Sequence, residues 1–353
     1  MSDPTQPEES AAEQPEPAPG SEPSTSEPSD TQAADAAEAP TATDRLDAAL
    51  DELESPTTVE ELEIAAAADA TPSPMPANGS LADLVRAPGS PDAPPYIDFE
   101  KVSIGFGDRK ILDEVSFHVN RGQTLCILGR SGVGKSVSLR ILLGFLKADS
   151  GYVRVDGQDI STLNEAGLQE VRKHVTMVFQ NGALFDSLTV GENVAFPLRE
   201  HGGLYEDQIQ KLVTRLLDLV GASETVNMLP SSLSTGQRRC ISIARALAAQ
   251  PEAILYDEPT TMVDPIMGRR IGDLIQRLKL QLGITSIVVT HDMRFAMRLA
   301  DMVLFLEAGQ ARFFGTIHEF LDCKDPHVQQ FLNLDSYVLP TPAGALHTPV
   351  TPA

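Results

Sequence analysis

The stretch Gly129-Arg130-Ser131-Gly132-Val133-Gly134-Lys135-Ser136 directly follows the apolar run Thr124-Leu125-Cys126-Ile127-Leu128. It has the form G-x-x-x-x-G-K-[ST], with an apolar strand before it and helical periodicity after it. Glycines let the backbone wrap closely, successive N–H groups and a helix N-terminus attract anions, and Lys135 adds a full positive charge. Ser136 offers a hydroxyl to Mg²⁺. Residues 129–136 are therefore predicted to bind the phosphates of a nucleotide.

Charge is distributed unevenly along the chain, whose formal net charge is −23. Residues 1–94 hold 21 acidic and 2 basic residues and are rich in Pro, Ala, Ser and Thr. Such a segment buries too little apolar surface to offset the entropy of ordering it, so residues 1–94 are predicted to be a disordered acidic tail. Residues 335–353, with four prolines, are predicted to be a flexible C-terminal tail. One folded domain, residues 95–334, is expected between them.

Composition also bears on partners and location. No basic face is visible, so a nucleic-acid partner is not expected. Cys126, Cys240 and Cys323 have neither disulfide nor metal spacing, which favours a reducing compartment, and Cys126 is expected in the core. A secretory leader is not expected, because the N-terminus shows no basic region followed by an apolar core. No apolar run approaches about 18 residues, so any membrane role is expected to come through a partner.

Short apolar runs separated by turns predict an α/β architecture. Strands are expected at 96–102, 115–119, 124–128, 152–155, 175–179, 254–256, 284–290 and 302–306, with a tight turn at Asp156-Gly157. The runs 254–256 and 284–290 suit strands covered on both faces. A helix is expected after Ser136, with apolar residues as far as Leu146, and a helical block is expected at about 181–250, between two sets of strands.

Two carboxylates follow a later apolar strand. In Ala253-Ile254-Leu255-Tyr256-Asp257-Glu258 the strand carries both acids to its C-terminal end, where α/β sheets place ligands. Asp257 is predicted to hold Mg²⁺ directly or through water. Glu258 is then predicted to orient, or accept a proton from, the water that attacks the terminal phosphate.

Three further elements suit the same chemistry. Leu233-Ser234-Thr235-Gly236-Gln237 precedes a helical run, so its hydroxyl, glycine backbone and helix N-terminus are predicted to form a second anion site. His291 follows the strand 284–290, and from there it can donate a hydrogen bond to a phosphate oxygen. Gln180 ends the strand 175–179 and begins the helical block. A glutamine at that point can contact Mg²⁺ or its waters and report occupancy to the helical block.

Taken together, these motifs resemble those of the ABC transporter ATPase family over residues 97–334. The resemblance implies a P-loop NTPase (RecA-like) core with an antiparallel β subdomain and an inserted α-helical subdomain, and ATP and Mg²⁺ as cofactors. It implies that residues 129–136 are the Walker A loop, Asp257 the Walker B aspartate, Glu258 the catalytic glutamate, Gln180 the Q-loop residue, Ser234 to Gln237 the signature, Asp264 the D-loop aspartate and His291 the switch histidine.

Three positions qualify that resemblance. Phe106 lies about where the family stacks an aromatic ring on adenine, and packing in the core is the alternative interpretation. Thr235 replaces the first glycine of the usual signature, which adds a Cβ and a methyl group near a phosphate. Met262-Val263 replaces the small-residue dipeptide before Asp264. Neither replacement removes a charged catalytic group, but both bear on the rate of turnover.

The family pairs two such chains head to tail, so the resemblance implies a homodimer. Each ATP then lies between the Walker A loop of one chain and the signature of the other. Residues 129–136 and 234–237 are both expected to bind anions, so one phosphate chain can hold them together. Hydrolysis and phosphate release would weaken that contact and drive a partner between two conformations.

Residues 180–200 and 326–332 look most like the Mla-type subfamily, the ATPases of MCE-associated phospholipid transporters that work between inner and outer membranes. That resemblance implies a permease dimer, an MCE-domain protein and, in some systems, a small STAS-domain protein as partners. It also implies a peripheral location on the cytoplasmic face of the inner membrane. An importer ATPase for an amino acid or another small solute is the alternative. A non-transport ABC protein is a further one, although this chain shows one cassette and no sustained heptads.

Overall fold

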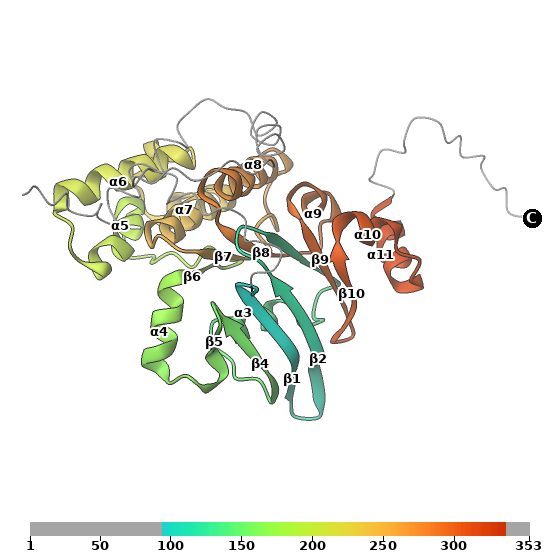
Figure 1. Ribbon diagram of the computed structural model, residues 1–353. Coiled ribbons are helices and arrows are strands. Elements are labelled where there is room, and N and C mark those ends of the chain that lie inside the picture. The colour runs from blue at the N-terminus through green and yellow to red at the C-terminus, as the bar shows by residue number, and fades with distance from the viewer. Residues whose placement is uncertain (1–93, 337–353) are drawn as a thin grey trace, which may run out of the picture. The chain divides into compact units, whose positions relative to one another are not determined.

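Two β-sheets organise the computed structural model, which describes the backbone of residues 94–336 and the side chains of residues 94–333 (Figure 1). The smaller sheet is antiparallel and has the order β2-β1-β4-β5. Its strands are β1 (Ile97–Phe106), β2 (Arg109–Val119), β4 (Ser150–Val155) and β5 (Gln158–Asp159). Asp156 and Gly157, with φ of 50° and 76°, form the predicted tight turn between β4 and β5.

The larger sheet has the order β10-β9-β3-β8-β7-β6 and contains the strand that precedes the glycine-rich loop. Its strands are β3 (Thr124–Leu128), β6 (Val175–Val178), β7 (Ala253–Asp257), β8 (Thr285–Thr290), β9 (Met302–Glu307) and β10 (Gln310–Thr316). All neighbours pair in parallel except β10, which runs antiparallel to β9. Parallel pairing brings the C-terminal ends of β3, β7 and β8 to one edge, which is where ligands bind in such sheets.

Helices cover this sheet and form a block at one end of it. In Figure 1 the helices α5, α6 and α7 gather next to β6, while α10 and α11 lie next to β10. The helices are α3 (Lys135–Leu142), α4 (Glu165–His174), α5 (Val190–His201), α6 (Glu206–Leu219), α7 (Thr235–Ala248), α8 (Pro265–Leu282), α9 (Met293–Leu299), α10 (Ile317–Asp322) and α11 (Pro326–Ser336). None of these described helices is long and apolar enough to cross a bilayer.

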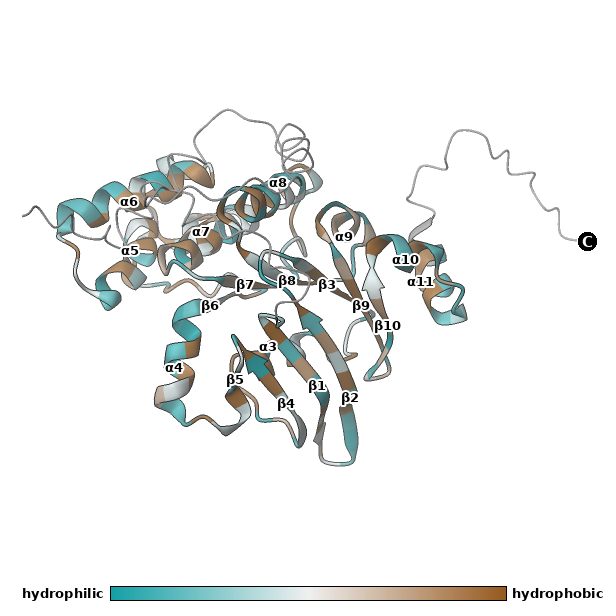
Figure 2. Cartoon of the chain, viewed as in Figure 1, coloured by the Kyte–Doolittle hydropathy of each residue, from teal (hydrophilic) through white to brown (hydrophobic). Residues whose placement is uncertain are grey.

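Two hydrophobic cores lie on opposite faces of the larger sheet. Alternate side chains of β3 point to different cores: Cys126 and Leu128 pack with α5 to α9, whereas Leu125 and Ile127 pack with β1, β2, β4 and α3. Because both faces are covered, β3, β7 and β8 are buried along their whole length and mostly apolar (Figure 2), rather than alternating between buried and exposed residues. The expectation that Cys126 is a core residue is confirmed.

Several sequence predictions need correction. The helix after Ser136 was expected to extend to Leu146, but α3 ends at Leu142 because Gly144 adopts φ +68° and stops it. Phe145 consequently lies 50% exposed beneath the guanidinium of Arg172. β1 reaches Phe106, beyond the predicted end at residue 102, and the strands β5 and β10 carried no sequence prediction.

The predicted tails lie almost wholly outside the residues that the structure describes. Residues 1–93 and 337–353 lie outside the described residues, and α11 ends at Ser336, beyond the predicted domain boundary at 334.

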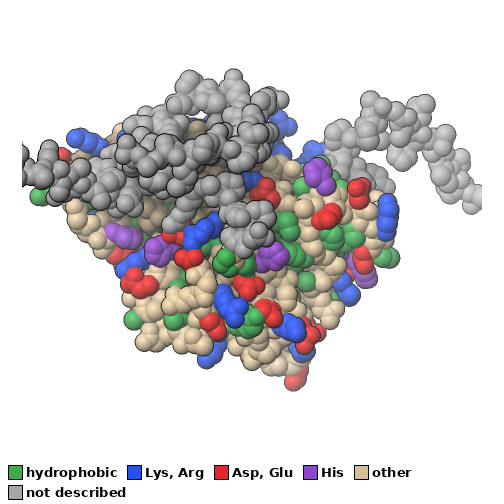
Figure 3. Space-filling model, in the orientation of Figure 1, with side chains coloured by type: hydrophobic (Ala, Val, Ile, Leu, Met, Phe, Trp, Pro, Cys, Tyr) green, Lys and Arg blue, Asp and Glu red, His purple; other side chains and the backbone are tan. Residues whose placement is uncertain are grey.

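Residues 95–353 carry 29 acidic and 25 basic residues. On the face seen in Figure 3, acidic and basic side chains are accordingly interspersed rather than gathered by sign.

Candidate nucleotide site

The glycine-rich loop runs from the end of β3 to the start of α3, and two of its glycines are required by close packing. Gly129 has φ +149°, and a Cβ on it would lie 2.3 Å from the carbonyl oxygen of Leu306. Gly134 has φ +106°, and a Cβ there would lie 2.5 Å from a methyl group of Leu112. The loop is therefore wedged between β9 and β2, which holds its N–H groups at the start of α3.

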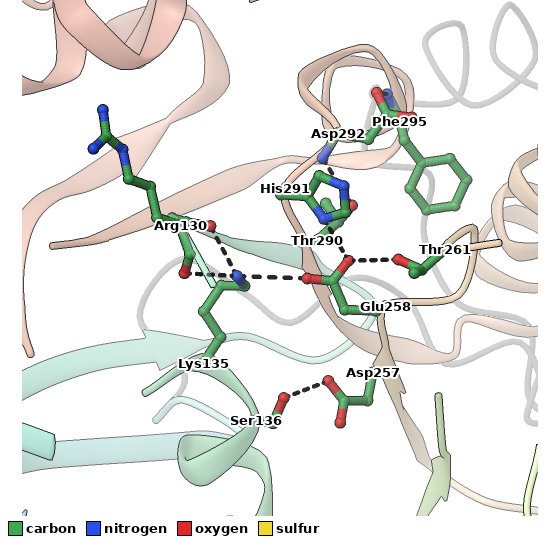
Figure 4. A network of polar contacts seen from close by, with 11 residues as sticks. Arg130, Lys135, Ser136, Asp257, Glu258, Thr261, Thr290, His291, Asp292 and Phe295 are labelled. Carbon is green, nitrogen blue, oxygen red and sulfur yellow. Dashed lines mark hydrogen bonds and ion pairs between the residues drawn. The ribbon is translucent and has the colours of Figure 1, made fainter. Parts of the chain in front are cut away.

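The Lys135 side chain lies within this loop and is only 5% exposed. Its Nζ donates hydrogen bonds to the carbonyl oxygens of Gly129 at 2.8 Å and Arg130 at 3.1 Å. The same Nζ lies 3.4 Å from Oε1 of Glu258, which forms an ion pair across to β7 (Figure 4). The lysine predicted to bind phosphate and the glutamate predicted to be catalytic are thus in direct contact.

Ser136 and Asp257 form a second contact between α3 and β7. The Ser136 hydroxyl donates to Oδ1 of Asp257 at 2.7 Å. Burial raises the pKa of the Asp257 carboxyl above its usual value, although the hydrogen bond from Ser136 opposes that shift. A bound cation would favour the charged form again, and a hydroxyl beside a carboxylate is an oxygen pair that suits Mg²⁺. The residues present therefore fit the predicted Mg²⁺.

Glu258 occupies the centre of the polar network in Figure 4. Its Oε2 accepts a hydrogen bond from Thr261 at 3.0 Å and lies 2.8 Å from Nδ1 of His291. Its backbone has φ +48°, and its N–H donates to the carbonyl of Val289 on β8. A non-glycine residue in this region is strained by about 1–2 kcal/mol, and such strain concentrates at functional sites. The pairing of β7 with β8 is what brings Glu258 and His291 together.

The predicted second anion site lies on other elements. Ser234 caps α7, its Oγ accepting from Gln237 N at 3.2 Å, while Gln237 Oε1 accepts from Ser234 N at 2.9 Å. Asp264 caps α8 by accepting from two backbone N–H groups. Gly236 packs against Met267, whose Cγ would lie 2.7 Å from a Cβ at that position. Within the described part of the chain, no hydrogen bond or ion pair joins these residues to 129–136.

The remaining predicted positions lie at the surface. Phe106 is 54% exposed at the end of β1, which rules out core packing as the explanation of this residue and leaves the ring available for stacking. Gln180 is exposed two residues after the end of β6. Thr235 is exposed at the first position of α7, and Met262 is 89% exposed with φ +60°.

Sequence reasoning missed three features of the site. Thr261 was not named, because a threonine three residues after a glutamate has no distinctive pattern. The contact of Lys135 with Glu258 joins the first residue of α3 to the residue that follows β7, and it depends on the order of the strands in the sheet. Arg239, a buried arginine of α7 that contacts the segment before Gln180, was missed because arginine is normally a surface residue.

The family model described as "ABC transporter" matches residues 112–261. The intermembrane phospholipid transport system ATP-binding protein MlaF of Haemophilus influenzae is 39% identical over 240 residues, covering 68% of this chain and 91% of that protein. The methionine import ATP-binding protein MetN of Rhizobium etli is 42% identical over 205 residues, covering 58% of this chain and 56% of that protein.

Among solved structures, the chain is similar to the ATP-binding cassette MJ0796 in a dimeric post-hydrolysis state bound to ADP and phosphate. The TM-score is 0.59 at 30% sequence identity, and the match covers 63% of this chain and 98% of that one. The fold described above is therefore that of a nucleotide-binding cassette.

Proposed function

The chain belongs to the ABC transporter family of ATP-hydrolysing subunits, and from this premise we propose that it powers phospholipid transport between the inner and outer membranes through a partner permease. The observation that carries the ATPase is the cluster of Lys135, Ser136, Asp257, Glu258 and His291 at one edge of the sheet. The proposed cargo is supported by the similarity to MlaF, which extends over 91% of that protein.

Each residue of the cluster has a proposed role. Residues 129–136 hold the phosphates through backbone N–H groups and Lys135. Ser136, Asp257 and Gln180 would hold Mg²⁺. The ion would neutralise negative charge on the phosphates. Glu258 orients the attacking water and takes its proton, because its carboxylate is fixed by Thr261 and His291 at the correct edge of the sheet. His291, more than half exposed, donates to the terminal phosphate.

A second copy of the chain completes the site in this proposal. Ser234, Gly236 and Gln237 of one copy contact the nucleotide held by residues 129–136 of the other, with Asp264 beside them and Phe106 stacked on adenine. The proposal is supported by the N-terminal position of Ser234 on α7, since the first N–H groups of a helix lack intrahelical partners and bind anions. The cassette MJ0796 was solved as a dimer with ADP and phosphate.

The proposed partners are a permease dimer, an MCE-domain protein and a STAS-domain protein, with the ATPase peripheral on the cytoplasmic face of the inner membrane. Residues 95–334 form the proposed ATPase domain, with tails at 1–94 and 335–353. Methionine import is the second candidate because the identity to MetN reaches 42%, but that match spans 56% of MetN.

Purification of the tagged chain from membranes in detergent, with mass spectrometry of co-purifying subunits and lipids, tests the proposal. We expect a permease and an MCE-domain protein with bound phospholipid to co-purify with the chain. We also expect the phospholipid-loaded complex to hydrolyse ATP faster than the isolated chain. Recovery of a solute permease with a substrate-binding protein, and no lipid, would overturn the cargo. A chain lacking residues 1–92 should bind Mg-ATP equally well, and loss of its fold would overturn the proposed domain boundary.

A further inference from the structure

Three side chains of α7 hold the segment that leads from Gln180 into the helical block. We call residues 179–185 the linker. The guanidinium of Arg239 donates to the carbonyl of Phe179, the Ser242 hydroxyl lies 2.7 Å from the carbonyl oxygen of Gly182, and Arg245 Nη1 donates to the carbonyl of Ala183 at 2.8 Å. These donors recur every three residues, so they lie along one face of the helix. We call them the donor ladder.

Arg239 is an unusual residue to use for this purpose. Its side chain is among the largest fully buried ones, and it is 2% exposed. Within residues 94–333, no carboxylate forms an ion pair with it, and its Nε has no hydrogen-bond partner. Burial lowers the pKa of its guanidinium. Burying a cation with only a backbone carbonyl as its partner costs free energy. The contact fixes the position of Phe179 and Gln180 relative to α7.

The linker packs closely against the donor ladder at Gly182. Gly182 has φ +79°, and a Cβ there would lie 2.8 Å from the Ser242 oxygen, so a larger residue would displace the contact. Ser242 also lies 2.7 Å from the carbonyl of Arg238, and its single proton serves one carbonyl at a time. On the other side, the buried Asn193 of α5 bonds both the N–H and the carbonyl of Phe185. The linker is therefore held firmly to the helices.

The far end of the linker reaches the surface. Arg245 lies 5.0 Å above the ring of Phe185, whose centroid is 5.0 Å from that of Phe196. These two rings are 41% and 40% exposed. The near end of the linker is Phe179, which is directly followed by Gln180. The N-terminus of the same helix carries Ser234, and the ladder begins five residues later. One rigid helix thus connects Ser234, Gln180 and an exposed aromatic pair.

We propose that Arg239, Ser242 and Arg245 are positioning residues that make α7 and the linker move as one body, and so couple the two nucleotide sites of the dimer. The inference rests on the proposed function. In that dimer Ser234 meets the nucleotide held by the partner copy, while Gln180 faces the nucleotide held by its own chain. Occupancy of one site is then transmitted along α7 and through the ladder to Gln180 of the other.

Steady-state ATP hydrolysis by the full chain, fitted for its Hill coefficient, tests the coupling. Each protein is also titrated with Mg-ATP by calorimetry in the Glu258→Gln background, and its unfolding is followed in urea. Wild type is expected to hydrolyse ATP cooperatively. Ser242→Ala and Arg239→Met are expected to bind Mg-ATP within about twofold of wild type, while the Hill coefficient falls to about 1 and kcat falls roughly tenfold. Arg239→Lys keeps the charge and a donor, and should restore part of the cooperativity.

Arg199→Met is the matched control, because Arg199 lies in the same helical block, is exposed and pairs with Glu206. It should leave cooperativity and kcat unchanged. Hydrogen exchange of amides 182–188 gives a second measurement: Mg-ATP should protect them in wild type and not in Ser242→Ala. If wild type is cooperative and a folded Ser242→Ala protein is equally so, the ladder is not the coupling element. If wild type neither binds nor hydrolyses ATP, the proposed function itself is wrong.

Discussion

The glycine-rich loop and the signature segment are both predicted to bind phosphate, yet the structure builds them differently. Around residues 129–136, two strands and a helix converge, and Lys135, Asp257 and Glu258 are all at most 9% exposed. Around residues 234–237, one helix begins at the surface, and Ser234 and Gln237 satisfy each other through reciprocal hydrogen bonds. The first region is a cluster of charged side chains in direct contact, whereas the second is a helix terminus that, among the described residues, forms no hydrogen bond or ion pair with residues 129–136.

This difference has a physical consequence. At the first region a bound phosphate would replace contacts that already exist between charged groups, such as that of Lys135 with Glu258. At the second region the capping box satisfies the amide of Gln237, while the amides of Thr235 and Gly236 have no intrahelical partner. The signature can therefore add to phosphate binding only when another surface brings the phosphate to it. Substitutions at four residues test this comparison, from the largest expected effect to the smallest.

Glu258→Gln is expected to slow hydrolysis by ~10²–10⁴-fold, because the amide cannot accept the proton of the attacking water. The amide still accepts a hydrogen bond, so Mg-ATP binding should persist and an ATP-bound dimer should accumulate. Single-turnover hydrolysis and light scattering measure the two effects. Glu170→Gln, an exposed residue of α4 paired with Lys173, is the control. Turnover at the wild-type rate would contradict the role of Glu258.

Lys135→Ala is expected to weaken Mg-ATP binding by ~10²-fold or more, because removing one partner of a buried charged contact costs about 2–5 kcal/mol. The measurement is isothermal calorimetry with a non-hydrolysed ATP analogue. Lys147→Ala changes an exposed lysine shortly after α3 and should have no effect. An affinity equal to wild type would show that the loop does not bind through this ammonium group.

Ser234→Asp and Ser234→Asn separate the two regions. Both side chains cap a helix well, so α7 should remain folded in each. The aspartate adds a negative charge where the partner's phosphate would approach, so the dimer should weaken by roughly tenfold, about 1.4 kcal/mol, relative to the asparagine variant. Analytical ultracentrifugation with Mg-ATP in the Glu258→Gln background measures this. Equal dimerisation of the two variants would argue against phosphate at the signature.

Asp257→Asn is expected to stabilise the nucleotide-free protein while removing Mg-dependent hydrolysis. Burial raises the pKa of Asp257, so the charged form is disfavoured in the fold and its cost appears as pH rises above the usual carboxyl value. At pH 7 the variant should melt roughly 2–4 °C higher, for about 1 kcal/mol. The gain should shrink as the pH falls through the raised pKa of the folded state toward the usual value of a carboxyl group. A lower melting temperature at pH 7 would show that burial of this carboxylate is not costly.

Much of the site was predictable because its elements are local in sequence. A strand, a glycine-rich turn and a helix start determine where residues 129–136 lie, and β7 necessarily carries Asp257 to its C-terminal end. The strands covered on both faces were predictable for the same reason, as at β7 and β8. Prediction failed at α3, where the apolar residues Phe145 and Leu146 suggested further helix, because Gly144 ends the helix through a conformation that periodicity does not register.

Contacts between elements required the fold. The approach of Glu258 to His291 depends on the pairing of β7 with β8, which no local pattern encodes, and Thr261 enters the network only because the chain turns back toward Glu258. Arg239 shows this most clearly. Composition places arginine at the surface, but packing of α7 against β6 surrounds its guanidinium and leaves a backbone carbonyl as its partner.

The predicted chemistry of this chain, a nucleoside triphosphate bound by glycine, lysine and serine beside two acids, could be inferred from short runs of sequence, because local hydrogen bonding and backbone geometry specify such a loop. The connection between the two predicted anion-binding regions could not, because it arises from long-range packing: the first turn of α7 follows Ser234, and its next turns hold the linker at Phe179 and Gly182, on either side of Gln180. Such contacts exist only after distant segments have come together.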